Sequence, residues 1–532
     1  MKKIFKKFIA LLSEHLIGIL ILAISVIIGL LVFKDYGISW DETIMRELGY
    51  MDYDYITKGG EYKPNPHYGV VTELPLVLLE LKLNITDYQK IYFMRHLFVH
   101  LLFLISAFGF YIILFNQTKR KSIAILGYIL LLLSPHLYAH SFYNSKDIPL
   151  ISYFIFTFLT LQFAIKYNFK WIFILLGIFC SMAISARIIG LLLFVSIIGL
   201  FLAKILLDKT KGQRIYILTN LGIFIISTIL FTYISWPLLW SSPIQSFIEM
   251  IELNSHYSVS GSLILFNGNY INSFHLPWWY LPGWMGITIP IGILVLFIFG
   301  IVIYGINLIK DAIKSNLRIE QNGLIFVSLS CFFVTLIAEM IFKMPIFDGW
   351  RHMYFLYLFV LLFATLAINW TFNKFSVKIG RMFVLSAYLY SLSILYFMII
   401  SHPFQHLYFN EIVNKDQENI REKYEFDVWG TSYRSGLEFI LNDSKKQIVN
   451  VAAAHTAAAF NTFILTKNER NRIRFVNSLD SADYFVSCYR GHPLEYPLRS
   501  KVYAPKVLNS TYIGVWRVQK EERKLNIPIE QQ

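Results

Sequence analysis

Eleven long apolar runs constrain the fold of this chain more than any other feature of its sequence. A membrane-spanning helix needs about 20 mostly apolar residues. Of the 532 residues, 56% are hydrophobic and 15% are charged, whereas soluble domains are about 45–50% apolar and about 25% charged. This excess excludes a water-soluble enzyme. We predict an all-α polytopic membrane protein with about 11 transmembrane helices, near residues 8–33, 92–115, 123–139, 148–165, 171–186, 188–203, 215–235, 285–308, 323–342, 352–370 and 382–400.

The basic residues predict which ends of these helices face the cytoplasm. The N-terminus and five loops, near 116–122, 166–170, 204–214, 309–322 and 371–381, hold 19 Lys and Arg, whereas the segment 236–284 holds none. Basic loops stay in the cytoplasm, so the N-terminus is predicted to lie inside. The stretch 171–203 has one charge, Arg187, and basic residues on both flanks. Two short spans put both flanks inside and place Arg187 at an outer turn, whereas one long span does not.

The segment 401–532 is much less apolar than the rest and is predicted to be a separate domain. Short β-rich runs lie at 448–451, 473–476, 484–488 and 512–518, and a helix is expected around 437–441. We therefore expect a transmembrane domain over 1–400 and an extracytoplasmic soluble α/β domain over 401–532. The net charge of +14 follows from membrane topology and does not indicate nucleic-acid binding. The three cysteines give neither a disulfide framework nor metal-ligand spacing.

The motif Ser39-Trp40-Asp41-Glu42 opens the first outer loop and allows two interpretations. In the structural one, Ser39 and Glu42 form a capping box at the start of an amphipathic helix, and Asp41 favours the helix dipole. In the functional one, Asp41 is a general base at the membrane surface. Neighbouring residues on a helix do not share a face, so Asp41 and Glu42 are expected to play different roles.

Other ionisable residues fall in the second outer loop and at outer helix ends. Lys146 and Asp147 lie just before Pro149. Asp147 can cap the next helix, or the pair can bind a phosphate, with a bridging cation left open. Arg187 is a functional candidate because a charge among apolar residues is expensive, although at an outer turn it can also snorkel to water. The remaining candidates are Arg95, Glu339, Arg351 and His352.

These residues all map to one face of the membrane in the predicted topology. A transporter tends to place ionisable residues near the midplane, whereas charges at one interface indicate chemistry on a lipid head group. A base with several cations suits transfer from a phosphate leaving group, because the base activates the acceptor while the cations stabilise the departing phosphate. Glu339 also has a structural explanation, an ion pair with Lys343 or Arg351.

Short motifs occur in order along nearly the whole chain: Trp40–Glu42, Asn144–Pro149, Ala186–Gly190, Trp236–Trp240, Leu276–Pro282, Gly349–His352, Tyr408–Asn410 and Phe426–Arg434. Together they resemble polytopic glycosyltransferases that use polyprenyl-phosphate-linked sugars. The closest resemblance is to bacterial relatives of the dolichyl-phosphate-mannose protein mannosyltransferases, which are glycosyltransferase family 39-like members of the GT-C superfamily.

The resemblance implies a GT-C-like fold and an enzyme that transfers a hexosyl or pentosyl group, with inversion, from a polyprenyl-phosphate donor to an extracytoplasmic hydroxyl. It implies that the acidic pair Asp41 and Glu42 lies at the active site, with Asp41 as the catalytic base. It also implies that Asp147 organises the phosphate region. Charge and position make further residues candidates for phosphate and donor binding: Lys146, Arg187, Arg351, His352 and Arg95.

The resemblance also sets the expected partners and location. The donor is a lipid-linked sugar, the acceptor is a glycan, lipid or protein, and the enzyme contacts membrane lipid in a bacterial cytoplasmic membrane. No cofactor is assigned, and a divalent cation is left open. The chain lacks an insert comparable to the lumenal domain of eukaryotic members, which counts against a protein acceptor, and the C-terminal domain is a candidate for acceptor selection.

Two alternatives remain open from the sequence. One is a transporter or flippase of lipid-linked sugars, which requires a polar path through the bilayer. The other resembles an oligosaccharyltransferase or ligase and moves a whole glycan from a diphosphate carrier, for which more cations are expected.

Overall fold

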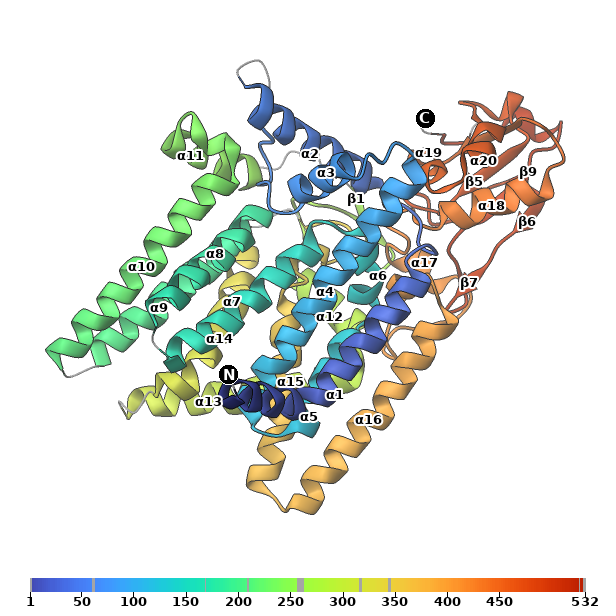
Figure 1. The fold of residues 1–532 in the computed structure, drawn as a ribbon. Helices are drawn as coiled ribbons and strands as arrows, with labels where there is room; N and C mark the ends of the chain where they lie inside the picture. The colour runs from blue at the N-terminus through green and yellow to red at the C-terminus, as the bar shows by residue number, and fades with distance from the viewer. Residues whose placement is uncertain are drawn as a thin grey trace.

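The computed structural model describes residues 2–59, 63–167, 169–207, 210–255, 263–314, 318–342, 346–525 and 527–529. Long helices run side by side and carry a small C-terminal domain at one end (Figure 1). Within the described residues, nine helices contain segments long and apolar enough to cross a membrane: α1 (Lys2–Val32), α4 (Tyr88–Thr118), α7 (Asp147–Tyr167), α9 (Leu191–Leu207), α10 (Lys211–Ser235), α13 (Ile291–Ile313), α14 (Ile319–Phe342), α15 (Leu356–Lys374) and α16 (Val377–Ile400).

Two further apolar runs account for the difference from the predicted number of spans. Helices α5 (Lys121–Leu132) and α6 (Pro135–Tyr143) form one run that is bent by 58°. The bend coincides with Pro135, which has no backbone N–H to continue the helix. Helix α8 (Lys170–Ala186) has 17 residues and is short for a span. The prediction of a mostly helical, multi-pass membrane protein is confirmed.

The long apolar stretch around Arg187 forms two antiparallel helices, as predicted. Helix α8 ends at Ala186, a short 3-10 turn (Ile188–Gly190) follows, and α9 begins at Leu191. A Cβ at Gly190 would collide with the backbone of Ala183, so only glycine permits this close turn. Because the chain reverses direction here, the basic flanks of α8 and α9 lie at the same end of the molecule.

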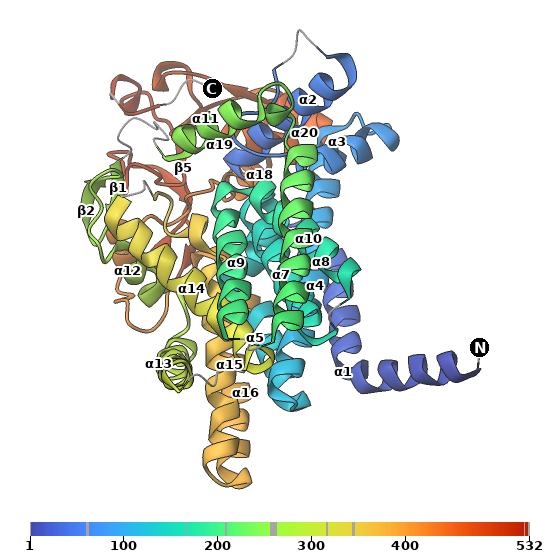
Figure 2. The ribbon, with the colours of Figure 1, turned by 90° about the vertical axis from the view of Figure 1, so that its left-hand side faces the viewer.

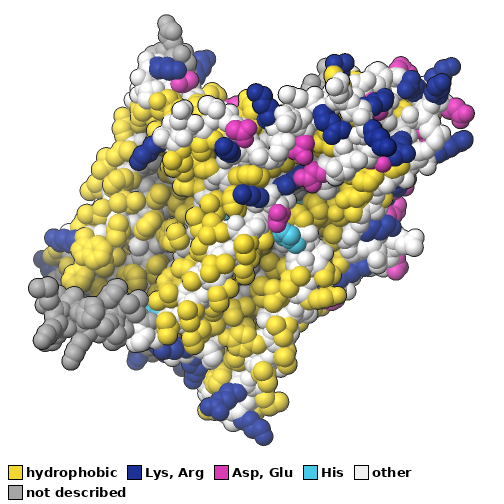
Figure 3. All heavy atoms as spheres, turned by 45° about the vertical axis from the view of Figure 1, so that its right-hand side comes forward, with side chains coloured by type: hydrophobic (Ala, Val, Ile, Leu, Met, Phe, Trp, Pro, Cys, Tyr) yellow, Lys and Arg dark blue, Asp and Glu magenta, His cyan; other side chains and the backbone are white. Residues whose placement is uncertain are grey.

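The two ends of the helices differ in chemistry. The end that carries the C-terminal domain is called the domain end. The other is called the basic end, because Lys119, Lys166 and Lys310 meet there around one cavity. Figure 3 shows a broad hydrophobic surface with Lys and Arg gathered at its lower limit and mixed charges at its upper limit. This distribution is typical of a chain that crosses a membrane.

Helices α7 and α15 form the packed centre of the helical part. Most of their side chains are buried, and aromatic rings join them. The ring centroids of Phe154 and Phe355 lie 4.8 Å apart, and those of Phe158 and Phe359 lie 5.6 Å apart. Aromatic pairs at these separations add to the stabilisation from burial alone.

Shorter elements cover the domain end. They are α2 (Trp40–Lys58), α3 (Glu73–Lys82), α11 (Pro243–Ser255), the hairpin β1 (Leu263–Phe266) and β2 (Asn269–Asn272), and α12 (Tyr280–Thr288). Figure 2 shows this hairpin and α12 beneath the C-terminal domain.

The predicted capping box at the start of α2 is confirmed, because the Ser39 N–H donates to Glu42 Oε2 at 3.0 Å. The Ser39 hydroxyl also donates to the Tyr143 carbonyl at 2.9 Å, which ties α2 to α6.

The C-terminal part is an α/β domain with a five-stranded sheet of order β4-β3-β5-β9-β6. Strand β3 is parallel to β4 and β5, whereas β9 is antiparallel to β5 and β6. The predicted strands form at β3 (Val449–Ala453), β4 (Ile473–Phe475), β5 (Tyr484–Ser487) and β9 (Gly514–Arg517). The sequence prediction missed β6 (Lys501–Tyr503), β7 (Lys506–Val507) and β8 (Ser510–Thr511), which are too short to show an alternating pattern. Around the sheet lie α17 (Asn419–Lys423), α18 (Tyr433–Asp443), α19 (Ala457–Asn461) and α20 (Lys467–Arg472).

Specific hydrogen bonds hold this domain against the helices. The Asn410 amide donates to the carbonyls of Gly286 and Ile289 at 2.6 and 2.7 Å. The Asn461 side chain accepts from the Ile38 N–H at 3.0 Å and donates to the Ile38 carbonyl at 2.9 Å. Because Ile38 lies three residues before Asp41, the C-terminal domain positions the start of α2.

Candidate active site

A cavity of about 300 Å³ lies at the domain end, between the membrane helices and the C-terminal domain. Its lining comes from segments far apart in the sequence: the start of α2, the loop before α7, the turn after α8, the loop before α15 and the loop after β5. The charged side chains that line it include Asp41, Lys146, Arg187, Asp348, Arg351 and Arg490.

Asp41 lies between two cations in this cavity. Its Oδ2 accepts from Lys146 Nζ at 2.6 Å and from Arg351 Nη1 at 3.1 Å. Burial raises the pKa of Asp41, but the charges of Lys146 and Arg351 outweigh burial and lower the pKa to about 2. Asp41 is therefore ionised at neutral pH, and its carboxylate is held in a fixed position.

The loop before α7 places Lys146 and Asp147 through a local turn. The Asn144 side-chain oxygen accepts from the backbone N–H groups of Lys146 and Asp147 at 3.2 and 2.9 Å. Asp147 is the first residue of α7 and does not cap this helix; Asn144 holds its backbone N–H instead. The Asn144 amide also donates to Asp147 Oδ2 at 2.8 Å, which leaves Oδ1 directed to another partner.

Arg187 provides that partner. Its Nη2 lies 2.7 Å from Asp147 Oδ1, and its side chain is 16% exposed. The two atoms are close but are not aligned as a hydrogen bond, and Arg187 Nε also lacks a hydrogen-bond partner among the described residues. The guanidinium can therefore donate to an anion in the cavity without first breaking an aligned hydrogen bond.

Arg351 connects three carboxylates. Besides its contact with Asp41, its Nη2 lies 2.8 Å from Asp348 Oδ2 and its Nη1 lies 3.8 Å from Asp147 Oδ2. The central carbon of its guanidinium lies 4.5 Å from the centroid of the Trp429 ring. The turn before it has a left-handed backbone, with φ of 56° at Asp348 and 72° at Gly349. Glycine adopts this conformation without strain, which gives the motif Gly349–His352 a structural reason.

The structure does not bring Glu42 and Arg95 to the cavity lining. Glu42 lies on the buried side of α2, and its Oε1 is 3.3 Å from His96 Nε2. Arg95 is also buried and pairs with Glu73 at 2.6 Å. The prediction that Asp41 and Glu42 play different roles fits this placement, because Asp41 faces the cavity and Glu42 supports the helix that carries it.

His352 and Glu339 take different places. His352 lines the cavity, and burial followed by the charges of Arg351 and Arg187 lowers its pKa well below the usual value, so its ring is neutral. Glu339 is buried on α14 and forms no ion pair with Arg351, whose guanidinium is engaged by aspartates. The alternative partner Lys343 lies outside the described residues.

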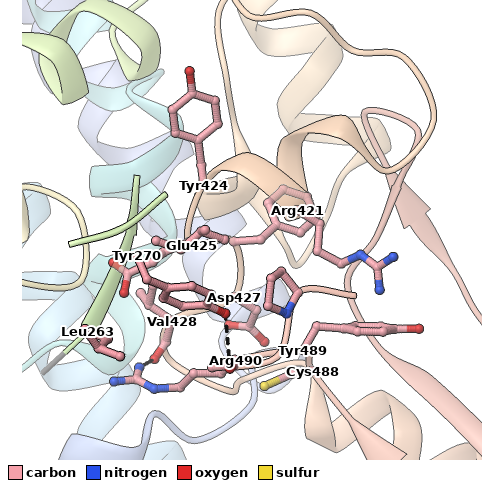
Figure 4. A pocket seen from close by; sticks show the side chains of 14 residues that line it. Leu263, Tyr270, Arg421, Tyr424, Glu425, Asp427, Val428, Cys488, Tyr489 and Arg490 are labelled. Atoms are coloured by element: carbon pink, nitrogen blue, oxygen red, sulfur yellow. Dashed lines mark hydrogen bonds between the residues drawn. The ribbon is translucent and has the colours of Figure 1, made fainter. Parts of the chain in front are cut away.

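The C-terminal domain adds two charged residues that the sequence analysis missed, Glu425 and Arg490. Arg490 Nη2 lies 3.1 Å from Asp348 Oδ1, and its guanidinium also donates to the Val428 carbonyl. Figure 4 shows both side chains in a small pocket of about 40 Å³ next to the main cavity, where the Tyr270 hydroxyl donates to the Gly491 carbonyl. Glu425 and Arg490 line both spaces. No charge or spacing signal in the sequence distinguishes either residue from a solvated surface charge.

Burial, and after it the charge of the neighbouring Asp348, raise the pKa of Glu425 to about 8. The Glu425 carboxyl is therefore mostly protonated at neutral pH. The cavity lining then holds four cations, Lys146, Arg187, Arg351 and Arg490, against two carboxylates, Asp41 and Asp348, while Asp147 lies outside the lining and pairs with Arg187. This excess of positive charge suits a bound phosphate.

The side chains that the structure describes form no recognisable metal site. Within the part of the chain that the structure describes, no group of three or more His, Cys, Asp or Glu is arranged to hold a metal ion. Asp41, Asp147 and Asp348 each contact an arginine instead.

No protein-family model and no curated protein sequence matches the chain. Among solved structures, it is similar to ArnT from Cupriavidus metallidurans bound to undecaprenyl phosphate, at 9% identity, over 95% of this chain and 98% of that chain, with a TM-score of 0.45. It is also similar to the oligosaccharyltransferase AglB from Archaeoglobus fulgidus in complex with an inhibitory peptide and a dolichol-phosphate, at 9% identity, over 90% and 70% of the two chains, with a TM-score of 0.44.

Proposed function

We propose that this protein is a membrane glycosyltransferase that moves one sugar from a polyprenyl-phosphate donor to an acceptor hydroxyl. The main support for this proposal is that one aspartate and three cations from separate segments converge in a single cavity at the domain end: Asp41, Lys146, Arg187 and Arg351. In the proposed topology the basic end faces the cytoplasm of a bacterium and the C-terminal domain lies outside. The division at residue 400 separates the membrane part from that domain.

The donor phosphate is proposed to bind where Arg187, Lys146 and Arg351 converge. In the structure, Lys146 and Arg351 form ion pairs with Asp41. When a phosphate shares these cations, Asp41 loses part of the attraction that lowers its pKa and becomes a stronger base. The bound substrate thus activates the group that must accept a proton.

The reaction is proposed to be a single displacement. The acceptor oxygen attacks the anomeric carbon, its proton passes to Asp41, and the bond from the anomeric carbon to the phosphate oxygen breaks. The electron pair leaves with the polyprenyl phosphate, whose charge Arg187, Lys146 and Arg351 stabilise. One displacement inverts the anomeric configuration.

The C-terminal sheet supports a role for this domain in acceptor binding. Strands β4 and β5 lie on opposite sides of β3, so the carboxyl ends of β3 and β5 mark a switch point, the usual ligand site of α/β sheets. The loops after these strands pack on Trp40, beside Asp41. The His455 ring centroid lies 6.3 Å from that of Trp40, and the Arg490 guanidinium lies 5.1 Å from it.

The two alternatives make different predictions. A transporter requires a polar path for the lipid-linked sugar through the protein, and an oligosaccharyltransferase-like enzyme requires a different bound lipid. A transporter needs a polar route, but the cavities at the two ends share no lining residue, and Phe154, Phe355 and Phe359 pack between α7 and α15. An enzyme of the oligosaccharyltransferase type would carry a diphosphate-linked glycan.

The test begins with mass spectrometry of lipids extracted from the purified protein. A polyprenyl monophosphate bearing one sugar supports the proposal and identifies the sugar, whereas a diphosphate-linked glycan supports the second alternative. The purified lipid is then incubated with the protein and envelope extract from a deletion strain. Release of polyprenyl phosphate with gain of one sugar on an extract component is the expected result. A donor that is bound but never cleaved would favour the transporter.

A further inference from the structure

A second cavity of about 800 Å³ lies at the basic end, far from Asp41. The ends of α4, α7, α13, α14 and α15 line it, and it shares no lining residue with the candidate active site. Ligand pockets in proteins typically span about 300–1,000 Å³, so this space can admit a lipid head group.

Carboxamides form much of the wall, and several are held in place by other side chains. Asn116 donates to Gln162 at 2.9 Å, which joins α4 to α7. Arg120 donates to the side-chain oxygens of Asn369 and Asn373 at 2.6 and 3.1 Å. Gln162 and Asn369 are buried, so they form a polar floor among apolar helices. Polar groups buried in this way are costly unless they are satisfied.

Lysines surround this floor as an exposed rim. Lys119, Lys166, Lys310 and Lys314 line the cavity, against the carboxylates Asp311 and Glu320. Within the described residues, no ion pair is formed by Lys119, Lys310 or Lys314 with either carboxylate, while Glu320 lies 3.9 Å from Lys204. The rim therefore carries an excess of positive charge.

The preference of Lys and Arg for the cytoplasmic side explains the lysines of the rim, but it does not explain the Asn and Gln residues of the floor. Lys and Arg gather on the cytoplasmic side of any multi-pass protein, whereas Asn and Gln carry no charge and contribute nothing to orientation. An amide floor below a cationic rim provides hydrogen bonds for hydroxyl groups below and a positive field for a phosphate above. Basic pockets between membrane helices on the cytoplasmic side suit anionic head groups.

We infer that this cavity binds a hydroxylated phosphodiester head group, of the phosphoglycerol kind, from the leaflet at the basic end. The phosphate lies among the rim lysines, and the glycerol hydroxyls reach the carboxamides. The bound lipid would bridge α7 and α15, the packed centre of the helical part, to α13 and α14.

The test uses the full-length chain in phosphatidylcholine nanodiscs that contain a minor fraction of phosphatidylglycerol. Native mass spectrometry measures the phosphatidylglycerol retained per protein. The double variant Lys310→Ala/Lys314→Ala is expected to retain severalfold less than the wild type. Lys378→Ala/Arg381→Ala is the matched control, because these basic residues lie on α16 at the same end but outside the cavity. Equal retention by all three proteins would overturn the inference.

Two further arms identify the source and the basis of recognition. Soluble glycerol 3-phosphate that displaces the retained lipid indicates a free polyol phosphate as ligand, whereas failure to displace it indicates a lipid. Phosphatidylserine has the same net charge as phosphatidylglycerol but lacks the glycerol head group, and it is tested at the same mole fraction. Equal retention of both lipids would mean that the cavity recognises only negative charge, which would contradict the inference. The substituted lysines are exposed, and unchanged thermal unfolding in pure phosphatidylcholine confirms that the variants fold. None of these measurements depends on sugar transfer.

Discussion

Replacing Asp41 by Asn separates a catalytic base from a helix-cap residue. Removing a general base slows turnover by about 10²–10⁴-fold, or about 3–5 kcal/mol of barrier. The same change removes a negative charge beside the proposed phosphate site. Two unit charges about 5 Å apart in an effective dielectric near 20 interact with about 3 kcal/mol. Affinity for undecaprenyl phosphate is therefore expected to stay constant or rise, while turnover collapses.

The assay measures both quantities on the same preparation. Binding of undecaprenyl phosphate is followed by native mass spectrometry in nanodiscs, and turnover by release of that lipid from the sugar-linked donor. The Asn side chain keeps an oxygen that can accept from Lys146, so the variant should fold. Asp35→Asn is the matched control, because Asp35 lies at the same end but pairs with His402 outside the cavity. Full turnover in Asp41→Asn, or parallel loss of binding and turnover, would show that Asp41 is not the catalytic base.

Three further changes test separate parts of the site. Arg187→Gln should weaken undecaprenyl phosphate binding by about tenfold or more, because a charge-assisted contact is lost, and unchanged affinity in nanodiscs would remove Arg187 from the phosphate site. The Glu425 carboxyl has a pKa of about 8 in the folded protein but about 4.3 in the unfolded chain, so the free energy of unfolding falls as the pH rises toward 8. In Glu425→Gln the thermal midpoint should therefore fall less between pH 6 and pH 9 than in the wild type. Equal falls in the two proteins would contradict this prediction. Gly37→Ala should greatly reduce the yield of folded protein, since its Cβ would collide with the Thr431 carbonyl, whereas Gly212→Ala, with open space around it, should behave as wild type in size-exclusion chromatography.

The sequence was sufficient for the helical architecture because membrane helices leave long, one-dimensional signals. The apolar runs and the basic loops predicted both the spans and the reversal at Arg187. The short strand β6 was missed, since three residues carry no periodicity. The bend between α5 and α6 was also missed, although Pro135 marks it, because hydropathy alone does not record direction.

The candidate site was partly predictable for the same reason. Asp41, Lys146, Arg187 and Arg351 stand out as charges at the ends of apolar helices, and the structure brings all four together. Arg95 has the same signal but pairs with Glu73, because sequence alone does not show which way a side chain points. Residues from the C-terminal domain carry no such signal, since charges are ordinary in a soluble domain.

The most direct test of the central claim compares envelope glycans by mass spectrometry in three strains: a deletion, the deletion with the wild-type gene, and the deletion with Asp41→Asn at matched protein level. We expect one sugar to disappear from one envelope component on deletion, to return with the wild type and to stay absent with Asp41→Asn. Restoration of the sugar by Asp41→Asn would show that Asp41 is not the catalytic base, and it would make Asp41 a structural residue of α2.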